Sequence, residues 1–188
     1  MSYVERRRFL WALLLAALVL LAIVANATTF ARMRFEDAAR RATAIARLRC
    51  LSASSFRENG EIWTDTRFAV VEQAKGSLPA IVSVRMLGGT IGNLHSRVED
   101  APAFRPEEEA YLFLWTREGE PLRVLGWSQG TFRIVRDART GIESVTQDSA
   151  ATPIFDQKTH KFVHEGIRNL PMATFRLKLS RALEGSTH

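Results

Sequence analysis

Cysteine is nearly absent from this sequence. Cys50 is the only cysteine among 188 residues, so no disulfide can form within the chain. A zinc site made from a cysteine and histidine cluster is excluded for the same reason. Side-chain packing must therefore hold the fold, and an apolar fraction of 46% is enough for a core. We interpret Cys50 as a small buried apolar side chain, with a reactive thiol or an intermolecular disulfide as the alternatives.

Phosphate-binding and metal-binding signatures are also missing. Gly88, Gly89 and Gly92 are not accompanied by the lysine and hydroxyl residue of a phosphate loop, and no helical pattern follows them. His160 and His164 have the spacing of metal ligands on a helix, but the surrounding sequence THKFVHEG is typical of a strand or loop. In such a conformation the two rings lie too far apart for one ion. We therefore predict no metal-binding or cofactor-binding residues and no cofactor.

The excess of positive charge is small once the first residues are set aside. The formal net charge is +6, and residues 1–27 contribute +2 of it through three arginines and Glu5, which leaves +4 for the rest. A strongly basic chain would suggest nucleic acid or an anionic surface as a partner. The remainder of this chain is only mildly basic.

The first 27 residues have the pattern of a secretory leader. A short basic start, Glu5–Arg8, precedes the apolar run Phe9–Val24 and the small-residue triplet at residues 25–27. We predict a hydrophobic leader helix that acts as a signal peptide over residues 1–27, with cleavage before Thr28. The alternative is an uncleaved signal anchor, since the run reaching Ala27 approaches the length of about 20 residues that spans a bilayer.

Both readings of the leader place the rest of the chain outside the cytoplasm. The arginines stay on the cytoplasmic side, and the chain after Thr28 is periplasmic or secreted, or is anchored to the inner membrane. This topology argues against nucleic acid as a partner. Contact with a membrane is expected only through the leader, if it remains uncleaved.

Alternating side chains between Ile62 and Gly89 give the clearest structural pattern. Apolar and hydroxyl residues from Ile62 to Val70 fall on one face, and Val82, Val84 and Met86 do the same in a second segment. A breaker-rich corner at residues 75–79 separates the two segments. The pattern predicts two antiparallel strands, each with a core side and a solvated side.

The other segments continue this β-rich plan. Residues 110–115 (AYLFLW) are apolar on both faces, which predicts a strand buried on both sides or at the seam of a barrel. Helical spacing predicts an amphipathic helix over residues 35–45 and another after Pro171. Further strands are predicted at residues 46–50, 122–126, 132–136, 142–146 and 161–164. We divide the mature chain into a domain over residues 28–146, then a linker and C-terminal helical extension over residues 147–188, with residues 147–153 as the linker.

Residues Thr90–Arg105 have little periodicity. They contain glycine, asparagine and proline, which predicts a long loop. Long ordered loops often carry function, so this loop is the expected binding surface. The carboxylates Glu107, Glu108 and Glu109 that follow are interpreted as a solvated turn.

One catalytic pattern is present. Gly126, Trp127, Ser128, Gln129 and Gly130 match G-x-S-x-G, the turn that exposes a nucleophilic serine in α/β-hydrolases. Aspartate and histidine follow in the order that a hydrolase triad uses, at Asp156 and then at His160 or His164. The context differs, because residues 131–136 alternate as a strand where the motif requires a helix, and no repeated βα units precede it. We keep a serine hydrolase as the alternative and interpret the motif as a glycine-bounded corner between strands.

The order of these motifs resembles that of a group of uncharacterised exported bacterial proteins, some of which are similar to netrin/tissue-inhibitor-of-metalloproteinase modules. The resemblance spans roughly residues 34–136. It rests on Ala44–Leu51, Trp63–Gly76, Val82–Gly89 with its LGG ending, Ala103–Leu114 (AFRPEEEAYLFL) and Gln129–Val135 (QGTFRIV). It implies a small closed OB-like barrel, a binding role, and a structural role for Gln129 and Gly130. The inhibitors chelate a protease metal through an N-terminal cysteine, and this chain has Thr28 at that end, so the inhibitory activity does not carry over.

Together these observations predict a mainly β fold. We expect a small antiparallel OB-like β-barrel of five or more strands, with an N-terminal and a C-terminal amphipathic helix, preceded by the hydrophobic leader helix. The predicted function is a non-enzymatic exported module of the cell envelope, or a secreted one, that binds a protein or an envelope polymer. No catalytic residue is assigned in this interpretation, and the serine hydrolase remains the alternative.

Overall fold

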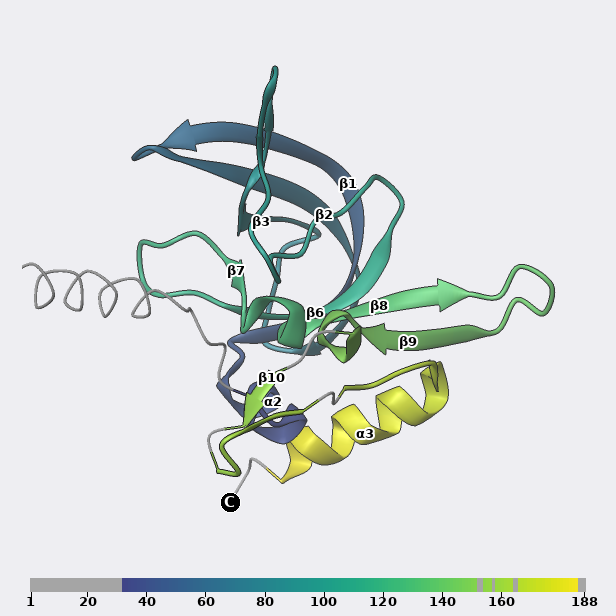
Figure 1. Ribbon diagram of the computed structural model, residues 1–188. Coiled ribbons are helices and arrows are strands. Elements are labelled where there is room, and N and C mark those ends of the chain that lie inside the picture. Colours follow the sequence, from purple (N-terminus) through teal and green to yellow (C-terminus); the bar gives the residue numbers. More distant parts are fainter. Residues whose placement is uncertain (1–31, 152–153, 157, 164–165, 186–188) are drawn as a thin grey trace, which may run out of the picture. The chain divides into compact units, whose positions relative to one another are not determined.

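The structure of this protein is mainly β (Figure 1). It is a computed structural model that describes residues 32–151, 154–156, 158–163 and 166–185. The predicted leader, residues 1–27, and its cleavage site lie outside the described residues. No helix within the described ranges has both the length and the apolar character needed to cross a membrane.

Eight strands of the described residues form one antiparallel sheet, in the order β12-β9-β8-β6-β1-β2-β3, with β7 also pairing to β6. The strands of this sheet are β1 (Ala44–Glu58), β2 (Glu61–Lys75), β3 (Ile81–Leu87), β6 (Glu109–Trp115), β7 (Arg123–Val124), β8 (Thr131–Arg136), β9 (Glu143–Gln147) and β12 (Leu170–Pro171). Two small hairpins pair β4 (Gly89–Ile91) with β5 (Leu94–Ser96), and β10 (Ile154–Asp156) with β11 (Lys161–Val163). The helices are α2 (Phe35–Arg41) and α3 (Met172–Glu184), with the 3₁₀ turns η1 (Trp127–Gly130) and η2 (Asp148–Ala151).

The predicted pair of strands between Ile62 and Gly89 is confirmed as β2 and β3. They are antiparallel neighbours, and Val82, Val84 and Met86 are buried as the alternation predicts. The turn between β1 and β2 has left-handed backbone angles at Asn59 and Gly60 (φ 51° and 87°), which favour these two residue types. Local patterning therefore located the long strands correctly.

The main sheet does not close into a barrel. One edge of β6 pairs with β1, and its other edge is divided between β8, at residues 110–112, and β7, at residues 114–115. The sheet therefore branches at β6. On its far side, β3 is joined to the segment before β7 by one backbone hydrogen bond, from Arg85 N to Leu122 O (2.8 Å), with no strand ladder between β3 and β7. The mainly β, antiparallel part of the prediction is confirmed, and the closed ladder is not present.

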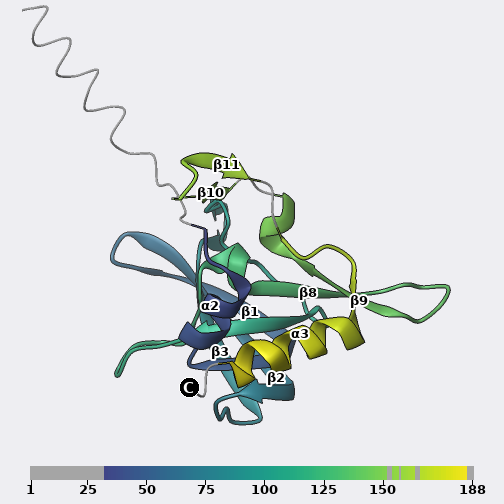
Figure 2. The ribbon, with the colours of Figure 1, turned by 90° about the horizontal axis from the view of Figure 1, so that it is seen from below.

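The side chains of β6 are buried on both faces, as the AYLFLW pattern predicts. Leu112 and Leu114 face one cluster, which we call the inner core, between β1, β2, β3 and β7. Tyr111 and Phe113 face a second cluster, the helix-side core, which is covered by α2 and α3 (Figure 2). In the helix-side core the rings of Phe113 and Phe132 lie 4.8 Å apart. Because β6 supplies both cores, it is the central strand of the fold.

Both predicted helices are present, and both belong to the helix-side core. Ala38 and Ala39 of α2 are buried there together with Phe175 and Leu179 of α3. Phe175 lies 5.0 Å from the ring of Tyr111. The segment at residues 170–184 thus packs on the same sheet as α2. Within the predicted linker, η2 buries Ser149 and Ala150.

The first helix ends earlier than its sequence pattern predicts. The prediction extended it to Ile45, but α2 ends at Arg41 and Ile45 lies in β1. Lys75 at the end of β2 explains the difference. Its Nζ donates to the carbonyl oxygens of Ala39 and Arg40 (2.8 and 2.7 Å). These hydrogen bonds replace those that a further turn of helix would have made to the same oxygens. The next residue, Gly76, packs against the backbone of Thr43, and a Cβ added to Gly76 would lie 2.6 Å from the carbonyl oxygen of Thr43.

The predicted long loop at Thr90–Arg105 was wrong in part. Its first half is the β4–β5 hairpin, with Leu94 exposed near the tip. Its second half is fixed to the inner core, because Phe104 is buried and its ring lies 5.2 Å from that of Phe68. Glycine and proline residues predicted the turns of this segment. They could not predict that the buried side chain of Phe104 would fix its second half to the core.

Candidate functional site

The G-x-S-x-G segment forms a corner that differs from a hydrolase elbow. Gly126 and Trp127 have left-handed backbone angles (φ 63° and 51°), Ser128 lies in η1 and is only 7% exposed, and the chain then enters β8. A hydrolase elbow requires an α-helix after the serine and a parallel sheet before it. Here a 3₁₀ turn leads into a strand, and every ladder formed by the described residues is antiparallel.

The proposed triad partners are only partly described. His160 is exposed, at a left-handed position between β10 and β11. The side chain of Asp156 and all of His164 lie outside the described part of the structure. The described geometry therefore brings no histidine to Ser128.

Gln129 gives the corner a structural role. Its Oε1 accepts a hydrogen bond from Met33 N (2.7 Å), and its backbone oxygen accepts one from Gln147 Nε2 (2.6 Å). The Oε1 of Gln147 in turn accepts a hydrogen bond from Ile167 N (3.2 Å). The two glutamines thus join the segment before α2, the start of β8 and the segment before β12.

Cys50 is buried in the inner core, which confirms the interpretation as a small apolar side chain. Burial raises the pKa of its thiol, and the carboxylates of Glu108 and Glu107 raise it further. A raised pKa disfavours the reactive thiolate.

The β8–β9 hairpin has an open strand edge. The β8–β9 hairpin, which we call the arm, runs out past β6 (Figure 1 and Figure 2). Pairing between β6 and β8 ends at Arg133, whereas β8 and β9 stay paired as far as Arg136. Ile134, Val135 and Arg136 therefore have a partner strand on one side only. The arm is held at its tip by Asp137, whose Oδ1 accepts hydrogen bonds from the backbone N–H groups of Arg139 and Thr140.

A cleft of about 430 Å³ lies along this open edge, and we call it the edge cleft. Its walls carry four carboxylates and three guanidinium groups beside two apolar side chains. The lining residues are Arg47, Glu107, Glu108, Glu109, Arg133, Ile134, Val135, Arg136 and Glu143. Val135 is 52% exposed.

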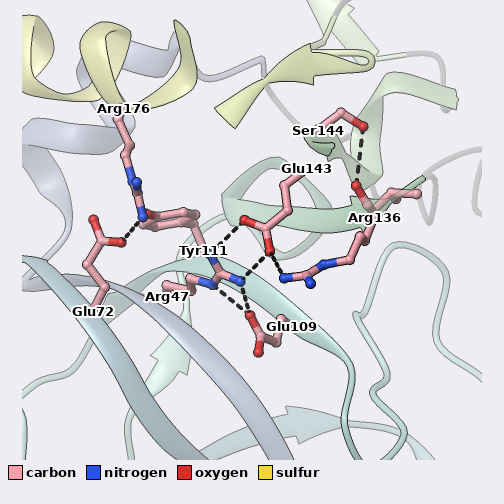
Figure 3. A network of polar contacts seen from close by, with 9 residues as sticks. Arg47, Glu72, Glu109, Tyr111, Arg136, Glu143, Ser144 and Arg176 are labelled. Atoms are coloured by element: carbon pink, nitrogen blue, oxygen red, sulfur yellow. Dashed lines mark hydrogen bonds and ion pairs between the residues drawn. The ribbon is translucent and has the colours of Figure 1, made fainter. Parts of the chain in front are cut away.

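Arg47 organises the floor of the edge cleft (Figure 3). Its Nε donates to Glu109 Oε2 (2.6 Å), and its two terminal nitrogens donate to the two oxygens of Glu143 (3.0 and 2.9 Å). Arg136 adds a further hydrogen bond to Glu143 (2.8 Å). Arg47 is on β1 and Arg136 is on β8, so the cluster fixes the turn-side end of the β8–β9 ladder to β1 and β6.

The pKa shifts in this cluster follow from its geometry. The hydrogen bonds from Arg47, followed by those from Arg136, lower the pKa of Glu143 from 4.5 to about 2. The same bonds to Glu143 raise the pKa of Arg47, although burial opposes the shift. Glu143 and Arg47 thus both stay ionised near neutral pH.

The opposite wall is held by Arg133. It pairs with Asp148 (2.8 Å) and Glu108 (2.9 Å), and its guanidinium lies 4.3 Å from the centre of the Phe104 ring. Burial raises the pKa of Asp148, while Arg133 lowers it. Glu107 is exposed at the rim with a left-handed φ of 71°, a conformation that is costly outside glycine and asparagine.

A separate polar cluster ties α3 to the sheet. Arg176 donates to Glu72 Oε2 (2.5 Å) and to the hydroxyl of Tyr111 (3.3 Å), as Figure 3 shows. Burial raises the pKa of Tyr111, so its hydroxyl stays protonated near neutral pH. This cluster lies at the boundary of the helix-side core and serves to position α3.

The edge cleft could not be seen in the sequence. Residues 46–50 were predicted only as a strand, and Glu107, Glu108 and Glu109 were interpreted as a solvated turn. The structure brings these charges together because β1 pairs with β6 in a register that places Arg47 opposite Tyr111, next to Glu109. The concentration of charge was visible in the sequence, but the pairing that assembles it was not.

Within the described residues, no three side chains of histidine, cysteine, aspartate or glutamate are placed to hold a metal ion. No protein-family model, curated protein or solved structure matches this chain. The fold and the edge cleft therefore carry the functional argument.

Proposed function

We propose that this chain is an exported, non-enzymatic module of the cell envelope, periplasmic or secreted, that binds a partner protein. The observation that carries the proposal is the open edge of β8 beside the edge cleft. Export rests on the leader pattern of residues 1–27. An exported module meets its partner outside the cytoplasm. We therefore do not propose nucleic acid as the partner.

The open edge supports binding by strand addition. An unpaired strand edge presents a row of backbone N–H and C=O groups that an extended peptide can pair with. Natural proteins usually protect such edges with charges, bulges or a covering segment. This edge carries the charged and exposed Arg136, and beside it the exposed apolar side chain of Val135, which a partner strand would bury.

The charges around the edge indicate what kind of segment binds. Glu143 and Glu109 are already paired to Arg47, and Glu108 is paired to Arg133. Glu107 adds an exposed carboxylate at the rim and makes no ion pair with the described residues. A segment with a basic side chain that reaches Glu107 and an apolar side chain against Val135 suits this cleft best.

We also propose that β1, β2, β3, β6 and β7 are the counterpart of an OB-like barrel, with an incompletely closed seam. The inner core supports this, because it is enclosed by these five strands and by Phe104. The single bond from Arg85 N to Leu122 O lies where such a seam would close. On the basis of this arrangement of strands, we also propose that the chain is related to the netrin-like modules.

A charge placed on the edge should abolish binding. We expect Val135→Lys to reduce capture of the partner from envelope extract by tenfold or more, because a lysine here opposes strand addition and removes an apolar contact. The matched control is Leu94→Lys on the β4–β5 hairpin, where the exposed side chain is similar (57% against 52%). The measurement is quantitative mass spectrometry of proteins retained by each variant.

The Leu94→Lys control also tests the expectation from the sequence that Thr90–Arg105 is the binding surface. Equal loss of capture in both variants, or loss only in Leu94→Lys, contradicts binding at the arm. Retention of a polysaccharide in place of a protein, unaffected by Val135→Lys, contradicts the assignment of the partner class. Glu107→Lys should weaken capture without changing the melting temperature, since this side chain is exposed.

A further inference from the structure

Two arginine–tryptophan pairs lie where β7 approaches β3, on the face of the sheet opposite the inner core. Val124 of β7 is buried in the inner core, so its neighbour Arg123 points to the other face. There the Arg123 guanidinium lies 5.1 Å from the centre of the Trp63 ring of β2. Trp115 of β6 is the strand partner of Arg123, and the Arg117 guanidinium lies 5.7 Å from the Trp115 ring. We call these four side chains the junction site.

We propose that the junction site binds the carboxylate of an organic ligand through the guanidinium of Arg123. A missing counter-ion is the first argument. Among the described residues, four arginines are partly buried: Arg47, Arg85, Arg123 and Arg133. Three of them each bind two carboxylates. Arg123 forms no ion pair within the part of the chain that the structure describes, although a charge partly removed from water is costly without a partner.

The Arg123 guanidinium is held in place and is open to a ligand. Its Nε is buried and has no hydrogen-bond partner. The two terminal nitrogens are not buried and make no hydrogen bond to the described residues, so a ligand can reach them. Contact with the Trp63 ring limits the movement of the side chain, which lowers the entropy lost on binding. The terminal fork of a guanidinium matches the two oxygens of one carboxylate.

Carboxylates around the junction site select a ligand with a single negative charge. Glu118 and Glu120 are exposed in the turn between β6 and β7. Asp65 and Glu58 are bound to Arg85, whose backbone N–H is joined to the residue before Arg123. These groups repel a doubly charged anion such as phosphate more strongly than a carboxylate.

The tryptophan rings provide the surface for the rest of the ligand. Trp63 and Trp115 are both partly exposed, and β7 carries Arg123 between their strands. Aromatic rings bind flat or apolar groups through stacking and burial of apolar area. The ligand class is therefore a monocarboxylate on an aromatic or apolar body.

Benzoate is the probe for this inference, with benzamide and inorganic phosphate as controls at constant ionic strength. Titration of benzoate into the purified ¹⁵N-labelled protein should shift the indole N–H resonance of Trp63 and the backbone amide of Arg123 in a saturable manner. Benzamide lacks the charge and phosphate lacks the aromatic body. Each should bind about tenfold more weakly, or worse.

Arg123→Gln should weaken benzoate binding about tenfold or more, because it removes a hydrogen-bonded charge pair. Arg123→Lys keeps the charge but loses the planar fork, so its affinity should fall between those of Arg123→Gln and the wild-type protein. Arg181→Gln is the matched control. It removes one exposed cation from α3 and should leave benzoate binding unchanged.

The outcomes separate ligand binding from a structural role of the Arg123 and Trp63 contact. A structural role alone predicts a lower melting temperature for Arg123→Gln and no saturable shift with benzoate, which would overturn the inference. Equal binding of benzamide or phosphate, or full affinity in Arg123→Gln, would overturn it as well. Should Arg123→Gln fail to fold, full affinity in Arg123→Lys would contradict the assignment of the fork.

The result is independent of partner capture at the arm. No member of the junction site lines the edge cleft. Val135→Lys should therefore leave benzoate binding unchanged, and Arg123→Gln should leave capture of the partner protein unchanged.

Discussion

Gly130→Ala is expected to lower the free energy of unfolding by about 3 kcal/mol or more. A Cβ added to Gly130 would overlap the carbonyl oxygen of Leu125 and would lie 3.1 Å from its carbonyl carbon. Leu125 cannot easily retreat, because its N–H is bonded to the carbonyl oxygen of Phe113 in β6 (2.8 Å). The clash is with backbone, so no side-chain rotation relieves it.

Thermal unfolding followed by circular dichroism measures this effect. A loss of 3 kcal/mol corresponds to a fall in melting temperature of about 6–12 °C for a chain of this length. Gly141→Ala is the matched control, because Gly141 has a left-handed φ of 69° with nothing within 4 Å of an added Cβ. That change should cost about 1 kcal/mol from backbone conformation alone. Equal stability of the two variants would contradict a structural role for the glycine that ends the G-x-S-x-G segment.

Arg47→Met should be the second most damaging change. The side chain of Arg47 is 12% exposed, between Glu109 (23%) and Glu143 (18%). Methionine keeps most of the apolar stem but leaves Glu109 without its cation and Glu143 with the exposed Arg136 alone. Removing one member of a fully buried pair costs about 3–5 kcal/mol, and partial exposure here reduces the expected loss to about 2–3 kcal/mol. Urea unfolding at pH 7 measures the difference.

The pH dependence gives a sharper test of the same cluster. The pKa of Glu143 is about 2 in the folded protein against an ordinary value of 4.5. A lowered pKa contributes stability that is fully present above pH 4.5 and is lost as the pH falls towards 2. The wild-type protein should therefore lose about 2 kcal/mol through this group across that window, and Arg47→Met should lose much less.

Arg136→Met is the control for the charge cluster. Arg136 bonds the same oxygen of Glu143 but is 68% exposed, so its loss should cost about 0.5–1 kcal/mol at most. A steeper acid dependence in Arg47→Met than in the wild-type protein would contradict the assignment of Glu143 to this pair. Equal losses in the two arginine variants would contradict the central role of Arg47.

The long strands could be predicted because their patterns are local. Alternation from Ile62 to Val70 depends only on which face of one strand is buried, and β2 follows it. AYLFLW predicted burial on both faces for the same reason, and the two cores on either side of β6 confirm it. The corner at Gly126–Gly130 was also correctly interpreted as a turn between strands, since the residues after it alternate.

The features that depend on pairing could not be predicted. The branching of the sheet at β6 depends on how two partners share one edge, and no residue within Glu109–Trp115 encodes that division. The end of α2 depends on Lys75, which lies more than thirty residues away from the helix in sequence. The edge cleft combines both effects, because register brings Arg47 to Glu109 and the length of the arm exposes Val135.

In-cell photo-cross-linking tests the central claim, binding of a protein at the arm, most directly. A photoreactive residue would replace Val135 in one strain and Leu94 in another, at two similarly exposed positions on different hairpins. We predict a discrete protein adduct from position 135, recovered in the envelope or secreted fraction, and none from position 94. An adduct from position 94 alone, or no protein adduct from position 135, would contradict the proposed binding surface.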